Sequence, residues 1–133
     1  MGTSKSAALA STEPDLAAKR ADELLNFLGI GPDGHVASLF PNAPGLHERE
    51  RLAIAAEAGL EPFVPRVTMT PPMLANADCA LFLVTGEDKA KAVRSAFAEQ
   101  PGDATPSSLI RARDGATIVL LDSAAASELP GSI

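Results

Sequence analysis

Two apolar six-residue segments, separated by a helical pattern, constrain the fold more than any other feature of this sequence. Residues Cys79–Val84 form a continuous apolar run that stops before Gly86, and residues Ala116–Leu121 form a second one. Between them, residues 87–99 have helical spacing, with an inward face that consists of Ala90, Val93, Ala96 and Phe97. This order predicts a βαβ unit whose two strands are parallel and buried on both faces.

Weaker patterns extend this unit into one α/β domain. Short strands are predicted at 52–56 and 66–69, and a short helix from Thr70 through Ala77. Residues 1–11 are typical of a disordered leader. A helix is predicted to begin at Thr12, and residues 24–30 fit either the end of that helix or a buried strand. We therefore predict a single domain over residues 12–133, a layered, parallel-type, Rossmann-like sheet flanked by helices.

Composition and charge exclude several classes of protein. The 133 residues allow one domain, and 17 acidic against 11 basic residues give a net charge of −6, which disfavours binding to nucleic acid or to an anionic membrane. The single cysteine, Cys79, cannot form an intramolecular disulfide or a cysteine-based metal site. No apolar stretch reaches the roughly 18 residues that cross a bilayer. These features predict a cytoplasmic protein, which could still bind a small anion with a few well-placed cations.

The glycine-rich segment from residue 29 to residue 41 is the first candidate for chemistry. Its glycines and Pro32 predict a tight turn that carries Asp33 and His35, two residues apart. A neutral histidine can take a proton from water, and a nearby carboxylate can orient its ring, so the pair suits general acid–base catalysis. A Pro-Asp-Gly turn with an incidental surface histidine fits the spacing equally well.

A second candidate lies where the first apolar run ends. The segment Thr85-Gly86-Glu87-Asp88-Lys89 begins a helix, where free amides and Lys89 would suit a phosphate, although an ordinary turn with a solvated lysine has this pattern more often. Arg66, at the start of a strand, is either a phosphate ligand or a solvated charge.

Topology predicts that these segments meet. In parallel α/β sheets, the loops at the carboxyl ends of the strands line one crevice, and both glycine segments follow such ends. A base beside an anion site suggests hydrolysis or isomerisation of a small phosphorylated molecule. His47 is expected to be a solvated surface residue. Arg111 and Arg113 fit either a surface turn or a contact at the rim of the substrate site, and the turn is favoured.

Three segments together resemble the 6-phosphogluconolactonase family, part of a larger group that includes glucosamine-6-phosphate deaminases and isomerases. They are GIGPDGHVASLFP from Gly29, PRVTMTPPML from Pro65 and LFLVTGEDKA from Leu81, and the resemblance covers about residues 29–122. Deaminases carry Asn-Glu-Pro after the Gly-His segment, where this chain has Leu39-Phe40-Pro41, which favours the lactonase.

The resemblance implies a function and a set of site residues. The reaction would be hydrolysis of 6-phospho-D-glucono-1,5-lactone to 6-phosphogluconate, in the pentose phosphate pathway, without a metal or organic cofactor. His35 would be the general base and Asp33 would orient it. The substrate and its phosphate would be bound by Gly31, Gly34, Arg66, Gly86 and Lys89.

The chain also departs from the family pattern. Members are roughly twice as long, and their N-terminal half, with a phosphate loop and a further arginine, has no visible counterpart here. The chain resembles the C-terminal half, so a partial sheet is expected, with self-association, a missing partner segment or low stability as consequences. The alternatives to a lactonase are a non-catalytic module that binds phosphosugars and, less favoured, a deaminase or isomerase.

Overall fold

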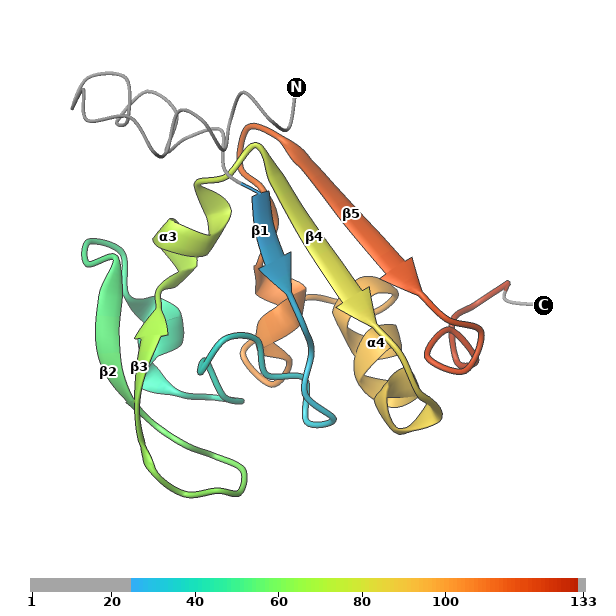
Figure 1. Cartoon of the computed structure of the whole chain (residues 1–133), viewed down its shortest axis with the longest axis horizontal. Coiled ribbons are helices and arrows are strands. Elements are labelled where there is room, and N and C mark those ends of the chain that lie inside the picture. The colour runs from blue at the N-terminus through green and yellow to red at the C-terminus, as the bar shows by residue number, and fades with distance from the viewer. Residues whose placement is uncertain (1–24, 132–133) are drawn as a thin grey trace.

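A three-stranded parallel sheet forms the centre of the computed structural model, which describes residues 25–131 (Figure 1). Its strands are β1 (Leu25–Leu28), β4 (Cys79–Val84) and β5 (Ala116–Leu121), in the order β1-β4-β5, and both neighbouring pairs are parallel. Between β4 and β5 the chain passes through η2 (Glu87–Lys89) and α4 (Ala90–Phe97). The predicted βαβ unit and the α/β class are confirmed.

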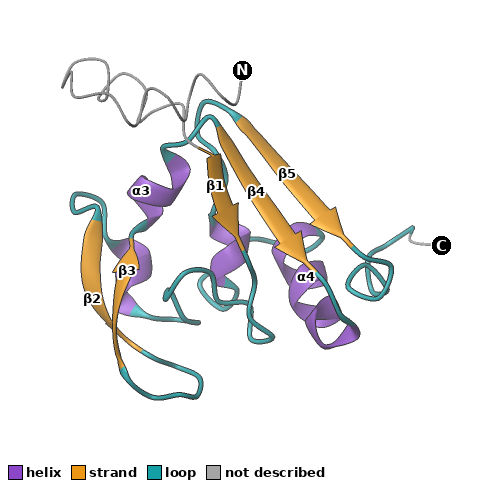
Figure 2. Ribbon diagram, viewed as in Figure 1, coloured by secondary structure: helices purple, strands orange, loops and turns teal. Residues whose placement is uncertain are grey.

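The hydrophobic core lies between one face of this sheet and α4 (Figure 2). Phe82 and Val84 of β4 are buried there, and the Phe82 ring contacts Phe97 edge to face at 5.3 Å. The opposite face is open: Leu83 is 44% exposed and Leu120 is 49% exposed. The prediction of strands buried on both faces is therefore wrong, because α4 and the core beneath it cover only one side of the sheet.

Helix α4 is shorter than the predicted span of 87–99. Its first turn is the 3-10 helix η2, and the helix ends at Phe97, shortly before Pro101, which has no N–H to donate. The buried side chains of α4 include Ala92, which the expected inward face lacked, and exclude Phe97, which is only partly buried. The amphipathic pattern thus identified the helix correctly but misjudged its ends.

Two further strands form a separate antiparallel hairpin, β2 (Ala53–Glu57) and β3 (Pro65–Met69). They lie within one residue of the predicted strands. Helix α3 (Pro71–Ala75) follows β3 and ends two residues before the predicted Ala77. The amide of Asn26 in β1 donates to the carbonyl of Leu74 at 2.7 Å, which holds α3 against the central sheet.

Two single-turn 3-10 helices complete the described chain, η1 (Pro44–His47) and η3 (Pro106–Leu109). The strand alternative for residues 24–30 is confirmed, because Leu25–Leu28 is β1. The predicted leader at 1–11 and the helix start at Thr12 lie outside the described residues. The domain boundary between them stays a prediction.

Candidate active site

The loops after β1 and β4 enclose a hollow at the carboxyl ends of these strands. Its volume is about 430 Å³, and its lining consists of Gly29, Ile30, Gly31, Pro32, His35, Ala37 and Lys89. Strand β1 carries the glycine-rich segment directly into this hollow, and η2 brings Lys89 to it from β4. The two glycine segments therefore meet as the topology of parallel strands predicts.

Asp33 and His35 form a close pair on the first loop. The His35 Nδ1 and Asp33 Oδ1 atoms are 2.6 Å apart, and the His35 backbone N–H donates to the same oxygen at 3.1 Å. A carboxylate can only accept, so Nδ1 is the donor in this contact, and in the neutral ring Nε2 is then the nitrogen with the free lone pair. Both side chains are about one quarter exposed, so solvent can reach the ring. This arrangement suits a general base that acts on water.

The backbone of the loop holds this pair in place. The Gly31 N–H donates to the His35 carbonyl at 2.9 Å, and the Gly34 N–H donates to the Gly31 carbonyl at 2.9 Å. Gly34 has a φ of 88°, a conformation in which a side chain would be strained. On its far side, the Gly34 carbonyl accepts from the Ser107 N–H at 3.0 Å. The loop is thus anchored to η3, an element that is 72 residues further along the chain.

An aromatic contact limits the movement of the His35 ring. Phe40 stacks on it with 4.5 Å between ring centroids and 29° between ring planes, and Phe40 itself is buried. The sequence contained this residue in the Leu39-Phe40-Pro41 segment, but its role was not predicted. A buried aromatic five residues after a candidate catalytic histidine was the available signal.

Lys89 reaches the hollow but already has a partner. Its Nζ atom donates to the Ile30 carbonyl at 2.5 Å, a contact that links η2 to the end of β1. The ammonium group has two further protons to donate. The Lys89 ammonium group can therefore contact an anion in the hollow while it keeps its hydrogen bond to Ile30.

The Gly86 amide is engaged by a carboxylate. Its N–H lies 3.1 and 3.2 Å from the two carboxylate oxygens of Asp122, which follows β5. A phosphate on this amide would have to displace Asp122. Sequence reasoning missed Asp122, although its position after the carboxyl end of a parallel strand is the same signal that pointed to the glycine segments.

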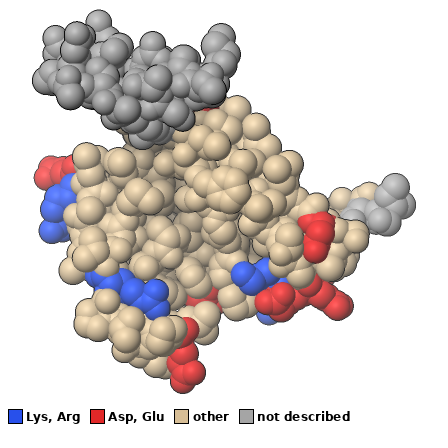
Figure 3. All heavy atoms as spheres, viewed as in Figure 1, with Lys and Arg blue, Asp and Glu red and all other residues tan. Residues whose placement is uncertain are grey.

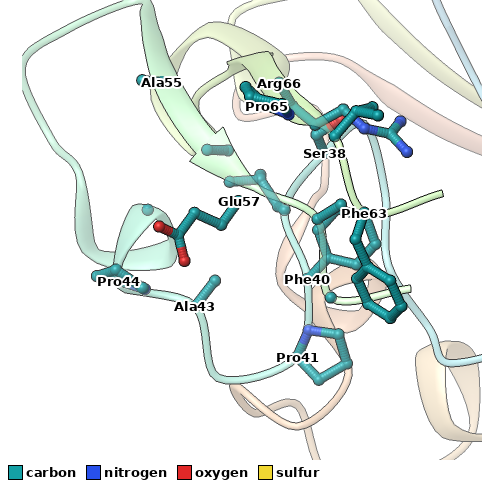
Figure 4. Close-up of a pocket in the computed structure, with 16 residues that line it drawn as sticks. Ser38, Phe40, Pro41, Ala43, Pro44, Ala55, Glu57, Phe63, Pro65 and Arg66 are labelled. Carbon is teal, nitrogen blue, oxygen red and sulfur yellow. The ribbon is translucent and has the colours of Figure 1, made fainter. Parts of the chain in front are cut away.

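Arg66 lines a different and larger cavity, of about 890 Å³, between the β2–β3 hairpin and the segment that follows His35 (Figure 4). One terminal nitrogen donates to the Pro62 carbonyl at 3.0 Å, and the Nε atom is buried without a partner. The structure therefore does not bring Arg66 into the hollow of Lys89. Phe40 lines this cavity and stacks on His35, so the two cavities adjoin at its ring.

The remaining polar residues singled out in the sequence lie away from the hollow. His47 is exposed, as expected, and its Nε2 atom pairs with Asp103 at 2.6 Å. The prediction of a surface turn is wrong for Arg111. One nitrogen of its guanidinium donates to the carbonyls of Ser107 and Ile110, and another donates to the carbonyl of Ala96, at distances of 2.7–2.9 Å. Burial lowers the pKa of Arg111. Arg113 is exposed.

Two searches of the described residues bear on other classes of site. Across 25–131, no group of three or more His, Cys, Asp or Glu side chains is arranged to hold a metal ion. Within the same range, none of the helices has the length and apolar character needed to cross a membrane.

Comparison with known proteins identifies the family. Residues 3–119 match the family model described as glucosamine-6-phosphate isomerases/6-phosphogluconolactonase. The chain belongs to this family. A 6-phosphogluconolactonase of Streptomyces coelicolor is 44% identical over 106 residues, which are 80% of this chain and 40% of that protein. The human 6-phosphogluconolactonase is 39% identical over 102 residues, which are 77% of this chain and 40% of that protein.

The solved structures agree with the sequence comparison. The crystal structure of 6-phosphogluconolactonase from Leishmania guyanensis matches with a TM-score of 0.69 and 31% identity, over 78% of this chain and 40% of that one. The resemblance drawn from the three sequence segments is confirmed. The chain spans about two fifths of the length of the relatives that it matches.

Proposed function

We propose that this chain hydrolyses 6-phospho-D-glucono-1,5-lactone to 6-phosphogluconate, the lactone-opening step of the pentose phosphate pathway. The observation that carries the proposal is the contact between Asp33 Oδ1 and His35 Nδ1, which are 2.6 Å apart. The loop that holds this pair is anchored by backbone hydrogen bonds, and it lines the same hollow as Lys89. The names of the relatives support the choice of substrate. The pair supports hydrolysis as the reaction class, since an oriented imidazole beside a cation suits attack of water on a phosphorylated ester.

The proposed mechanism uses His35 twice. Its Nε2 atom takes a proton from water as the water oxygen forms a bond to the lactone carbonyl carbon. Asp33 stabilises the imidazolium through the Nδ1 contact and keeps the ring oriented. The tetrahedral intermediate then breaks its bond to the ring oxygen, which receives the proton from Nε2. The product leaves as a carboxylate and releases one proton to solvent.

Binding of the phosphate is proposed to position the lactone. Lys89 would contact the 6-phosphate while its link to Ile30 keeps it at the hollow. Arg66 lines the adjoining cavity and would reach the phosphate only if its guanidinium left the Pro62 carbonyl. Gly31 and Gly34 would border the lactone, and Gly86 would contribute only if Asp122 moved away. Fixing the phosphate places the carbonyl near the base, which is a large source of rate acceleration.

The test is lactone hydrolysis above the spontaneous rate at near-neutral pH, for the chain, for His35→Ala and for His47→Ala. His47 is the matched control, because it also pairs with an aspartate at 2.6 Å but lies outside the hollow. We expect His35→Ala to lose at least about 100-fold of the rate and His47→Ala to keep it. Equal rates in the two variants would refute the role of His35.

A binding module without turnover is the second candidate function. It is favoured by one observation, namely that the chain covers about two fifths of the length of the lactonases that it matches. Isothermal titration with 6-phosphogluconate separates the two functions. Binding that depends on Lys89, by a folded chain that does not accelerate hydrolysis, would replace the lactonase proposal with this one.

A further inference from the structure

Phe40 joins the candidate general base to the β2–β3 hairpin, and we propose that it is a positioning residue for His35. Its ring stacks on the imidazole with 4.5 Å between ring centroids, and the residue is 4% exposed. The inference deepens the proposed function, and its kinetic part rests on that function. Its structural part concerns only the orientation of the His35 ring, which can be measured without any substrate.

The contact with Asp33 does not by itself fix the orientation of the His35 ring. It holds Nδ1 at 2.6 Å from the carboxylate oxygen, but the ring can still tilt about that atom. A tilt moves Nε2, the atom that is proposed to take the proton from water. Misplacement of a reacting group by about 1 Å can cost about 100-fold in rate, so the plane of the ring must be fixed as well. The stacked Phe40 ring, at 29° to the imidazole plane, supplies that restraint.

Phe40 is itself held in place by the hairpin. Gly59 lies in the loop between β2 and β3, and a Cβ atom added to it would be 3.0 Å from Phe40 Cβ and 3.2 Å from Phe40 Cγ. The backbone of the hairpin loop therefore packs directly against the phenyl side chain. Phe40 has no room to retreat from His35 on that side.

A hydrogen bond fixes the chain between the two stacked rings. The Ser38 N–H donates to the Thr68 hydroxyl of β3 at 3.0 Å, and that hydroxyl donates to the Met69 carbonyl at 2.9 Å. Thr68 is 2% exposed. Ala37, directly before Ser38, has a φ of 51°, a conformation that a residue with a side chain keeps only where its surroundings enforce it. The hairpin thus determines the path of the chain from His35 to Phe40.

Charge contributes little to this link between the hairpin and the loop. Within residues 25–131, none of the ion pairs joins the hairpin to the loop that carries His35. Figure 3 shows charged side chains around a largely uncharged centre, and Figure 4 shows Ser38 and Phe40 beside Phe63 and Pro65 of the hairpin. Packing and hydrogen bonds therefore hold the two segments together, and the hairpin has a role in the site through Phe40.

The first test compares the His35 ring in the native chain, Phe40→Leu, Phe40→Tyr and Phe82→Leu. Leucine removes the flat ring, whereas tyrosine keeps it. Phe82 is the matched control, because it is also buried and contacts a second aromatic ring, at 5.3 Å, but lines neither cavity.

Nuclear magnetic resonance separates the two restraints on the ring. ¹⁵N shifts report which ring nitrogen is protonated, and ¹³C relaxation of the Cδ2–H and Cε1–H bonds reports motion of the ring. We expect Phe40→Leu to keep the proton on Nδ1, because Asp33 remains, and to increase the motion of the ring. Phe40→Tyr and Phe82→Leu should leave both unchanged. The exposed His47 ring is the internal reference in every spectrum.

The kinetic test follows from the same geometry. Loss of Phe40 should lower kcat and leave KM nearly unchanged, because the proposed phosphate ligand Lys89 is held by Ile30 and not by Phe40. We expect Phe40→Leu to lose at least about 10-fold in kcat with a change in KM below about twofold. Phe40→Tyr and Phe82→Leu should keep kcat within about threefold of the native chain.

Gly59→Ala tests the role of the hairpin without altering Phe40. The new methyl group would crowd the phenyl side chain, and the displaced ring would in turn disturb His35. We expect a loss of about 3–10-fold in kcat and a change in the relaxation of the His35 ring. Gly102→Ala, whose Cβ atom would meet nothing within 4 Å, should change neither.

Unchanged ring motion in a folded Phe40→Leu chain would overturn the proposal, as would equal changes in Phe82→Leu. A native chain that does not hydrolyse the lactone would refute the proposed function and leave the spectra to decide the role of Phe40. Circular dichroism establishes whether each variant is folded. In the case of an unfolded Phe40→Leu chain, the comparison of Gly59→Ala with Gly102→Ala decides, and identical His35 spectra for these two would overturn the proposal.

Discussion

Replacing Gly31 with alanine should disable the Asp33–His35 pair while leaving the backbone of the loop unstrained. A Cβ atom at this position would overlap the Cε1 and Nδ1 atoms of His35 and would lie 2.8 Å from Asp33 Oδ1. Gly31 is not among the residues with positive φ, so alanine can adopt its backbone conformation. The effect is therefore steric and is directed at the side chains of the pair.

The geometry gives the size of the effect. To restore van der Waals contact with the new methyl group, the ring must retreat by about 1 Å or more, which takes the 2.6 Å contact with Asp33 beyond hydrogen-bond distance. Phe40 stacks on the ring at 4.5 Å and hinders this retreat. Loss of an oriented general base lowers the rate by about 10²–10⁴-fold.

The matched control is Gly102→Ala, because a Cβ atom there would meet nothing within 4 Å and Gly102 does not line the hollow. Lactone hydrolysis should fall by at least about 100-fold in Gly31→Ala and by less than about threefold in Gly102→Ala. Long-range ¹⁵N spectra of the His35 ring should show protonation on Nδ1 in the native chain and in Gly102→Ala, and a mixture of tautomers in Gly31→Ala. Equal rates and equal spectra for the two alanine variants would refute the reasoning.

Three other substitutions test the supports of the site and of the fold. Arg111→Ala should lower the free energy of unfolding by about 2–4 kcal/mol in urea titration, because the carbonyls of Ala96, Ser107 and Ile110 lose a charged donor; a loss below 0.5 kcal/mol would contradict this role. The pKa of Glu48 is lowered from 4.5 to about 2 by the backbone N–H of Glu50 and by Arg51, so its contribution to stability is present above pH 4.5 and is lost as the pH falls towards 2. Glu48→Gln should flatten the stability profile in that interval, and an unchanged slope would show that other carboxylates dominate it. His47→Ala should cost less than about 1 kcal/mol, measured by thermal unfolding, because its pair with Asp103 is exposed; a larger loss would mean that this contact holds the two loops together.

Local patterns predicted most of the secondary structure. The apolar runs at Cys79–Val84 and Ala116–Leu121 are strands β4 and β5, and the amphipathic segment between them contains α4. These features depend on spacing and side-chain type within a few residues, which the sequence displays directly. Helix ends were less accurate, because the 3-10 turn at η2 and the end at Phe97 depend on the packing around them.

The candidate site was predictable in part for a related reason. The carboxyl ends of parallel strands converge, so the meeting of the His35 loop with Lys89 followed from the order of elements. The placement of Arg66 did not follow, because the hairpin that carries it forms a separate antiparallel sheet with its own cavity. The anchoring of Gly34 by Ser107 and of Gly86 by Asp122 joins residues far apart in the chain, and no local pattern encodes such contacts.

The sequence by itself determined the α/β class, the family and the Asp33–His35 pair, because periodicity, motif order and a two-residue spacing are properties of the linear chain. Only the tertiary structure decided which side of each strand is covered. In a continuous apolar run, no polar residues identify the side of the strand that faces solvent. The sequence therefore could not show that Phe82 lies in the core while Leu83 faces outward. That distinction depends on where α4 packs against the sheet.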